Sequence, residues 1–243
     1  MLTGRRKRQE KGFSFIESLI SLSIFLAIVL ASLEFFSFSR SLYLKIKTQE
    51  GTELAALWAL ERMKTDVLHA GLGLLGPIHL NLLEGITEAD GALIILSEER
   101  NFSPVANLFQ GQTRIQLEST EEMKKEREIC ILDSSNGELK SISSVEKKSI
   151  VLSSPLSFSF PKEKTRLILL EKISLFYDDE EQTIKRKVNS SPAQPLLEEA
   201  ALFNFDYEKI TNLIRLRLAL TASKEKVYEI SVYPKNTALA SRR

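Results

Sequence analysis

The sequence predicts an α+β fold in which a long N-terminal helix packs on an antiparallel β-rich domain. Neither Gly nor Pro occurs between residues 13 and 50, and apolar residues then continue at helical spacing to about residue 70. From about residue 90 the pattern changes to short strand-like runs separated by polar turns. The chain has 243 residues, 43% of them hydrophobic and 27% charged, which is ordinary for a folded protein.

The charge and cysteine content argue against a nucleic-acid-binding protein and against a fold held by disulfides. The formal net charge is +1, without the broad basic field that is typical of nucleic-acid binding. Cys130 is the only cysteine, so no intramolecular disulfide can form and the apolar core must hold the fold together.

The N-terminus combines a basic flank with a long apolar run. Residues 5–11 read RRKRQEK, and residues 13–33 contain Glu17 as their one ionisable side chain. At a rise of about 1.5 Å per residue, a helix over this run covers about 30 Å, which is one hydrocarbon thickness. The basic flank should stay cytoplasmic, so we expect the chain after Leu33 to lie on the far side of a membrane.

Three interpretations of this N-terminus differ in what they explain. A secretory signal peptide has a shorter apolar core followed by a small-residue cleavage site, whereas this run ends in Leu33-Glu34-Phe35-Phe36. A simple signal-anchor helix explains the length and the basic flank. It does not explain Glu17, because a carboxylate in a spanning helix costs a few kcal/mol.

The third interpretation rests on the order Lys11-Gly12-Phe13-Ser14-Phe15-Ile16-Glu17. This order resembles the signature of type IV prepilins, in which a basic leader, a Gly and an aromatic residue precede a Glu and a hydrophobic helix. The resemblance implies that a prepilin peptidase cleaves between Gly12 and Phe13 and methylates the new amine of Phe13. It also implies that Glu17 acts in assembly by pairing with the Phe13 amine of a neighbouring subunit, which offsets the desolvation of both charges.

The helix should continue beyond the apolar run and end near Gly71, a common helix stop. We therefore expect one helix of roughly 55–60 residues, embedded in a membrane first and packed on a globular domain later. The packed part should use one apolar face with steps of three and four residues, formed by Ala56, Leu60, Met63, Val67 and Ala70.

The segment 57–76, LWALERMKTDVLHAGLGLLG, resembles the corresponding helix of PilW-type minor pilins and J-type pseudopilins at Asp66, Ala70 and Gly71. We interpret Asp66 as a surface or capping residue. Residues 71–76 also spell G-x-G-x-x-G, but a helix precedes them and Pro77 follows, so we expect no dinucleotide site.

The β-rich part contains a turn signal and a charged run. Asn136-Gly137 predicts a hairpin turn, and residues 119–128, STEEMKKERE, predict a solvated loop or short helix, with a partner-binding patch as the alternative. In residues 213–220, Ile214 and its alternate neighbours should face the core while Arg215 and Arg217 face water. The predicted strands are 92–96, 114–117, 128–132, 149–152, 166–170, 173–177, 183–187, 201–207, 213–220 and 227–233.

The C-terminal third resembles the same pilin subgroup, except that Glu199-Ala200 stands where relatives often carry a Gly. The resemblance covers most of residues 12–76 and 170–236, and residues 80–165 match only as a generic β-rich insert. The matching C-terminal positions are Gln194, Pro195, Leu196, Glu198, Phe205, Tyr207, Arg215, Arg217, Pro234 and Asn236.

The sequence offers no catalytic constellation and no cofactor or zinc site. His69 and His79 lack a second pair of ligands at zinc spacing. Cys130 lies in an apolar run, where an inert core thiol is expected. The acidic residues 178–181 could attract Ca²⁺, although they lack the spaced oxygen ligands of a calcium loop.

These interpretations divide the chain into a leader (1–12), a transmembrane part of the helix (13–34), an exported amphipathic part (35–71), a β-rich domain (72–236) and a tail (237–243). We expect a minor pilin or pseudopilin, not an enzyme. It would be held in the inner membrane with a cytoplasmic N-terminus and an exported domain until it enters a type IV pilus or a type II secretion pseudopilus. Expected partners are a prepilin peptidase, other pilin or pseudopilin subunits and the inner-membrane assembly platform, without nucleic acid or small-molecule substrate. The alternative is a signal-anchored periplasmic binding or adaptor protein that does not polymerise.

Overall fold

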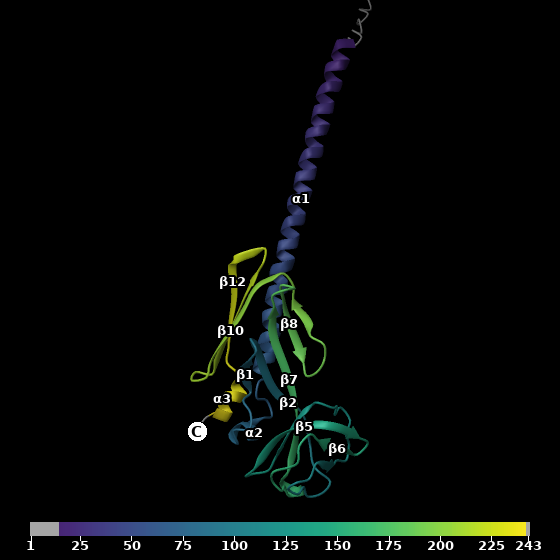
Figure 1. The fold of residues 1–243 in the computed structure, drawn as a ribbon. Helices are drawn as coiled ribbons and strands as arrows, with labels where there is room; N and C mark the ends of the chain where they lie inside the picture. The colour runs from purple at the N-terminus through teal and green to yellow at the C-terminus, as the bar shows by residue number, and fades with distance from the viewer. Residues whose placement is uncertain (1–14, 242–243) are drawn as a thin grey trace, which may run out of the picture. The chain divides into compact units, whose positions relative to one another are not determined.

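A computed structural model describes residues 15–241 and has the predicted α+β composition (Figure 1). Helix α1 (Phe15–Leu68) is followed by the short helix α2 (Leu75–His79), twelve strands with the 3-10 turn η1 (Lys162–Lys164) among them, and helix α3 (Lys235–Ser241). The chain forms two compact units, Met1–Gly51 and Thr52–Arg243, which are described separately.

All strand pairs in the second unit are antiparallel, and they form a nine-stranded and a three-stranded sheet. The larger sheet has the order β1-β2-β7-β4-β5-β6-β3, with β8 and β9 attached through β7. It comprises β1 (Ile86–Ala89), β2 (Ala92–Phe102), β3 (Arg114–Gln116), β4 (Glu128–Leu132), β5 (Gly137–Glu146), β6 (Ser149–Leu152), β7 (Arg166–Asp178), β8 (Thr183–Val188) and β9 (Gln194–Leu197). The smaller sheet has β10 (Ala200–Glu208), β11 (Leu213–Leu220) and β12 (Ser223–Val232) in that order.

Each predicted strand falls on an observed strand, but the bounds and the number of strands differ. β2 continues to Phe102, β12 already begins at Ser223, and β1 and β9 are strands that were not predicted. The runs 166–170 and 173–177 are not separate strands but parts of the 13-residue strand β7. Glu171 and Lys172, which interrupt the apolar pattern, stay in register with Ser97 and Leu96 of β2. The predicted hairpin between β4 and β5 is confirmed, but its loop is residues 133–136. Gly137 is the first residue of β5 and pairs with Leu132, and neither Asn136 nor Gly137 has a positive φ.

The core of the second unit lies between the last part of α1 and both sheets. The predicted helix face is confirmed, since Ala56, Met63 and Val67 are fully buried. Alternate residues of β11 such as Ile214 and Leu216 belong to the same buried cluster. Burying each large aliphatic side chain contributes about 1.5–3 kcal/mol, so this interface holds the end of α1 firmly on the β domain.

The insert between β2 and β7 has a core of its own. Its strands lie at the lower end of the β domain in Figure 1, around the labels β5 and β6. Apolar side chains from β3, β4, β5, β6 and the first half of β7 fill this second core, together with five residues from the connecting segments. Those five residues are Leu108, Leu117, Met123, Leu156 and Phe160.

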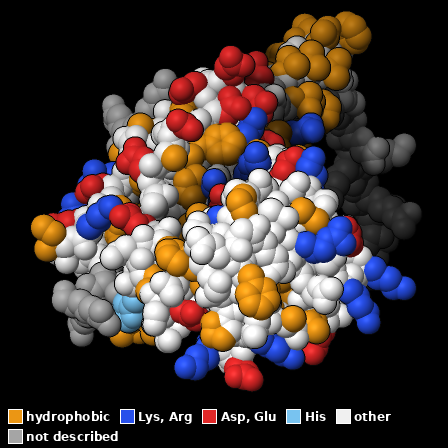
Figure 2. Space-filling view, turned by 60° about the horizontal axis from the view of Figure 1, so that its bottom comes forward, with side chains coloured by type: hydrophobic (Ala, Val, Ile, Leu, Met, Phe, Trp, Pro, Cys, Tyr) orange, Lys and Arg blue, Asp and Glu red, His pale blue; other side chains and the backbone are white. Residues whose placement is uncertain are grey.

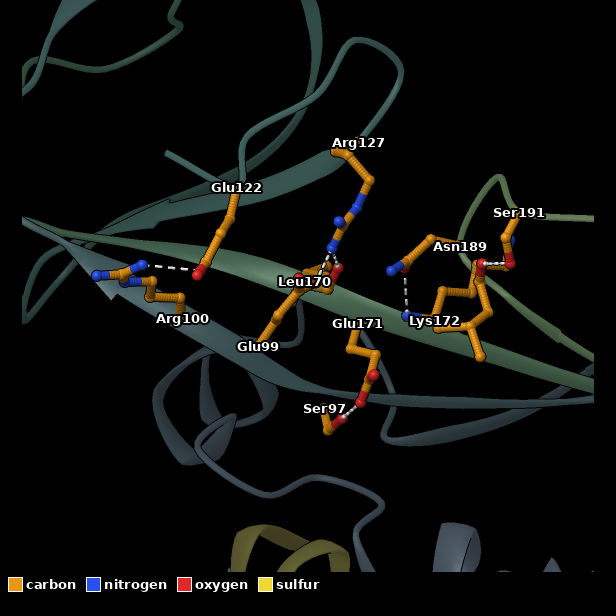
Figure 3. Close-up of polar contacts among 11 residues, drawn as sticks. Ser97, Glu99, Arg100, Glu122, Arg127, Leu170, Glu171, Lys172, Asn189 and Ser191 are labelled. Carbon is orange, nitrogen blue, oxygen red and sulfur yellow. Dashed lines mark hydrogen bonds and ion pairs between the residues drawn. The ribbon is translucent and has the colours of Figure 1, made fainter. Parts of the chain in front are cut away.

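The charged run 119–128 is not simply a solvated loop, because Met123 and Arg127 are buried. Figure 3 shows Arg127 reaching β2 and β7, where it pairs with Glu99 and donates a hydrogen bond of 2.6 Å to the Leu170 carbonyl. Glu99 lies at a register shift in β2, and such bulges redirect side chains. The partners of Arg127 are distant in sequence, so the local pattern gave no sign of its burial.

Residues 237–241 of the expected tail (237–243) belong to helix α3, and residues 242–243 lie outside the described residues. Thr237 is buried, and its hydroxyl lies 2.8 Å from two acceptors, the Asn212 side-chain oxygen and the Pro234 carbonyl, which share its one proton. The Tyr207 hydroxyl also donates to the Asn212 oxygen, at 2.8 Å. Helix α3 is therefore an ordered part of the β domain.

Candidate functional site

The first unit is an apolar helix with almost no buried surface. All Leu, Ile, Phe and Tyr side chains of Phe15–Ile46 are 46–79% exposed. By length and composition, α1 is the one described helix that could cross a membrane. Monomeric soluble proteins rarely expose so large a contiguous apolar surface, so this helix needs a covering of lipid or of other protein.

The polar side chains of this helix are compatible with an apolar covering. The hydroxyl groups of Ser23 and Ser32 donate to the carbonyls of Leu19 and Ile28, at 2.9 and 2.7 Å. An unpaired hydroxyl would be costly in hydrocarbon, and these bonds remove that cost within the helix itself. The serines therefore do not prevent the helix from lying in lipid.

The predicted site residues lie at the start of this helix or before it. Glu17 is exposed in the first turn of α1, where its negative charge also interacts favourably with the helix dipole. Gly12 and Phe13, the predicted cleavage and methylation positions, lie outside the described residues.

The last part of α1 is attached to the β domain by a buried ion pair. Asp66 accepts hydrogen bonds from Nε and Nη2 of Arg186 on β8, at 2.7 and 3.0 Å. The side chains of Asp66 and Arg186 are 4% and 17% exposed. The hydrogen bond with Asp66 raises the pKa of Arg186 above its ordinary value, so Arg186 stays charged.

The prediction that Asp66 is a surface or capping residue is therefore wrong. Asp66 points into the domain because Arg186, 120 residues later, supplies a bidentate partner. The sequence identified Arg186 only as one position of the predicted strand 183–187. Arg62 on the next turn of the helix is a weaker second partner, with its Nε 3.7 Å from the Asp66 carboxylate.

Two further contacts fix both ends of this helix segment. Lys226 on β12 pairs with Glu53 at 2.7 Å, and its ammonium group lies 5.0 Å from the centre of the Tyr228 ring. Near the other end, the Asn236 side-chain amide donates to the Leu68 carbonyl at 3.3 Å, which satisfies one of the last free carbonyls of the helix. Residues 52–68 are thus held by both sheets and by α3.

Other candidate positions serve the fold. Cys130 is buried, and desolvation raises its pKa to about 12, as expected for an inert core thiol. In the acidic turn 178–181, Lys185 lies 2.7 Å from Asp178 and 2.9 Å from Glu181, so an internal cation already neutralises part of the charge. Among the side chains that the structure describes, no three from His, Cys, Asp or Glu are grouped to hold a metal ion.

The comparisons with known proteins give no family. No protein-family model matches the sequence, and no curated protein matches it. Among solved structures, the chain is similar to the tailspike of Pseudomonas phage phi297, with 9% identity over 30% of this chain and 14% of that chain and a TM-score of 0.28. It is also similar to the tailspike of Acinetobacter baumannii bacteriophage AP22, with 9% identity over 31% of this chain and 15% of that chain and a TM-score of 0.28. A third similar structure is the phage phi92 endosialidase, with 7% identity over 60% of this chain and 36% of that chain and a TM-score of 0.21. The chain spans about a third or less of these proteins, and TM-scores this low establish no common fold.

Proposed function

We propose that this protein is a minor subunit of a type IV pilus or of a related secretion pseudopilus. In this proposal a prepilin peptidase cleaves after Gly12 and methylates Phe13, and the β-rich domain lies outside the cytoplasmic membrane. The observation that carries the proposal is the order Gly12-Phe13-x-x-x-Glu17 at the head of an exposed apolar helix. The resemblance to prepilins supports the processing step, and the exposed apolar surface of the helix supports the assembly step.

The apolar surface of Phe15–Ile46 can be covered in two successive ways. Before assembly, lipid can cover it, because the helix is long and apolar enough to span a bilayer. After extraction, the helices of neighbouring subunits can cover it by packing against it. A protein that remained a simple anchor would need only the first covering and would not need Glu17.

The charge pairing explains why a carboxylate belongs at position 17. Cleavage would create an amine at Phe13 beside the apolar surface, and each charge alone would be expensive to take out of water. Pairing the amine with Glu17 of a neighbour offsets both costs and fixes the stagger between two helices. Glu17 is therefore proposed as an assembly residue and not as a catalytic one.

The processing step is tested by intact-protein mass spectrometry after co-expression with a prepilin peptidase. We expect the loss of residues 1–12 and the gain of one methyl group on Phe13. A chain that keeps its initiator Met in the presence of the active peptidase would refute the proposal and favour the signal-anchored adaptor.

The assembly step is tested with Glu17→Gln, which removes the charge and keeps the size. We expect normal membrane insertion and processing but much less subunit in sheared fibres. Glu34→Gln is the matched control, because Glu34 is exposed on the same helix and lies beyond the prepilin-like signature. Equal incorporation of both variants would refute the role of Glu17.

A further inference from the structure

The insert of the β domain has an uncharged surface that the fibre proposal does not use. Residues 101–113 and residues 149–161 contain no charged side chain, although 27% of the whole chain is charged. We call the face formed by these two segments the uncharged surface. Figure 2 brings this end of the molecule forward; its central area is mostly white and orange, which is backbone and uncharged side chains, and most Lys, Arg, Asp and Glu side chains lie around it.

Backbone hydrogen bonds join the two segments. Leu108 and Phe160 exchange two bonds of 2.9 Å, and Leu156 accepts from Gly111 at 2.8 Å and donates to Gln112 at 3.0 Å. The Ser159 hydroxyl accepts from the Gln110 N–H at 3.0 Å. The segments are about 50 residues apart in sequence, yet they form one surface.

Large apolar side chains alternate between the core and this surface. Leu108, Leu156 and Phe160 are buried in the insert core. In contrast, Phe109 is 64% exposed and Phe158 is 45% exposed. Burying a Phe would contribute about 1.5–3 kcal/mol, so the exposed rings do not serve the stability of the monomer.

A buried carboxylate fixes the backbone that carries Phe158. Glu138, which is 6% exposed, accepts hydrogen bonds from the N–H groups of Ser157 and Phe158 at 2.7–2.9 Å. Its charge is balanced by Lys140 at 2.9 Å, and Lys140 also donates to the Pro155 carbonyl at 2.8 Å. These contacts hold the loop in one conformation without a ligand, and such preorganisation lowers the entropic cost of binding.

A cavity of about 300 Å³ opens beside Phe109, which is at the lower end of the range for ligand pockets. Aromatic and aliphatic side chains, amides and one guanidinium line this cavity. The lining residues are Ala106, Asn107, Leu108, Phe109, Gln112, Arg114 and Gln116.

The polar groups of this cavity are neutral or neutralised. The Arg114 guanidinium is paired with Glu146 at 2.7 Å. The Gln112 amide is locked, because its oxygen accepts from the Phe109 N–H at 3.0 Å and its amino group donates to the Arg114 carbonyl. The Asn107 oxygen accepts from the Lys162 N–H at 2.8 Å, so its amino group can face the cavity.

We propose that the uncharged surface binds a neutral saccharide through this cavity. A phosphate or sulfate ligand would need an available cation, and a metal ion would need carboxylates, neither of which the lining offers. A sugar has an apolar C–H face that packs on an aromatic ring and hydroxyl groups that both donate and accept. Phe109 provides the ring, the Gln116 amide provides both a donor and an acceptor, and the Asn107 amino group provides a further donor.

The proposal is tested on the full-length chain in a polyoxyethylene detergent, because maltoside detergents would compete as sugars. The probe is an immobilised panel of neutral oligosaccharides of glucose, galactose, mannose and N-acetylglucosamine, with sulfated oligosaccharides as the charged comparison. We expect at least one neutral oligosaccharide to bind and the sulfated ones not to bind more tightly.

Two variants locate the site. Phe109→Ala and Gln116→Met should each weaken binding at least tenfold, with unchanged circular dichroism. Ile210→Ala is the control, because Ile210 is 96% exposed and lies outside both segments. Absence of binding to every neutral oligosaccharide, or equal binding by Phe109→Ala, would overturn the proposal. If Phe109→Ala instead reduced fibre incorporation without any glycan binding, the surface would be a protein interface. The proposal concerns the β domain alone, so it can fail while cleavage and methylation are confirmed.

Discussion

Removing the guanidinium of Arg186 should weaken the attachment of the end of α1 to the β domain. Arg186→Met keeps the length of the side chain and leaves the Asp66 carboxylate, which is 4% exposed, without its bidentate partner. A buried pair broken on one side destabilises by about 3–5 kcal/mol. Arg62 lies 3.7 Å away and can take over part of the interaction, so we expect about 3 kcal/mol.

For a domain of this size, a loss of 1 kcal/mol lowers Tm by about 2–4 °C, which predicts a decrease of about 6–12 °C for Arg186→Met. The assay is thermal unfolding of the full chain in detergent, followed by circular dichroism. Arg215→Met is the control, because Arg215 is 41% exposed and its contact with Asp206 is 4.0 Å long. Exposed pairs contribute about 0–1 kcal/mol, so the control should lose at most a few degrees.

The double variant Asp66→Leu with Arg186→Met separates the charge from the packing. Replacing both partners of a buried pair by apolar groups is often neutral, so the double variant should recover most of the stability that Arg186→Met loses. A loss of less than about 1 kcal/mol for Arg186→Met would refute the reasoning. So would a double variant less stable than either single variant.

Three further predictions concern the β domain. The pKa of Glu138 is lowered, because the hydrogen bonds from Lys140 and two backbone N–H groups outweigh the opposing effect of burial. The ionised Glu138 therefore stabilises the fold fully above its unfolded pKa of about 4.3, and this stabilisation is lost as the pH falls through its folded pKa. Glu138→Gln should accordingly lower Tm at pH 7 but should not lower it at a pH below the folded pKa of Glu138. Burial raises the pKa of the Cys130 thiol to about 12, so in the folded protein Cys130 should resist iodoacetamide at pH 8 and react only after unfolding. Rapid alkylation of the folded protein would contradict the burial of Cys130. Gly71→Ala should lower Tm by several degrees, because Gly71 has φ +72° and an added Cβ would lie 3.0 Å from Thr237 Cγ2. An unchanged Tm would show that this turn relaxes freely.

The elements that could be predicted from the sequence are those whose signal is local. The face of α1 that includes Met63 is a repeat of three and four residues, and Ile214 begins a strict alternation in β11. The Asn136-Gly137 signal likewise marked the connection between β4 and β5, although the loop itself is residues 133–136 and Gly137 already belongs to β5. In each case the residues that decide the conformation are neighbours along the chain.

The features that could not be predicted depend on partners far away in sequence. Asp66 and Arg127 look like solvated charges in their own segments, and only Arg186 and Glu99 make their burial possible. The uncharged surface was missed for a related reason. The absence of charge could be read from each segment, but only the Leu108–Phe160 pairing shows that the segments form one face.

The two kinds of contact between α1 and the β domain have different consequences. If the helix slid by one turn along the domain, the stripe of small and medium side chains such as Ala56, Ala59 and Met63 would still present a largely apolar face to it. The ion pairs would not survive that shift, because Asp66–Arg186 and Glu53–Lys226 join fixed positions on two different sheets. Burial therefore supplies the affinity between helix and domain, whereas the charges fix the register. If the fibre proposal is correct, the helix transmits an extraction force to the β domain, and a fixed register is what allows the domain to follow without slipping.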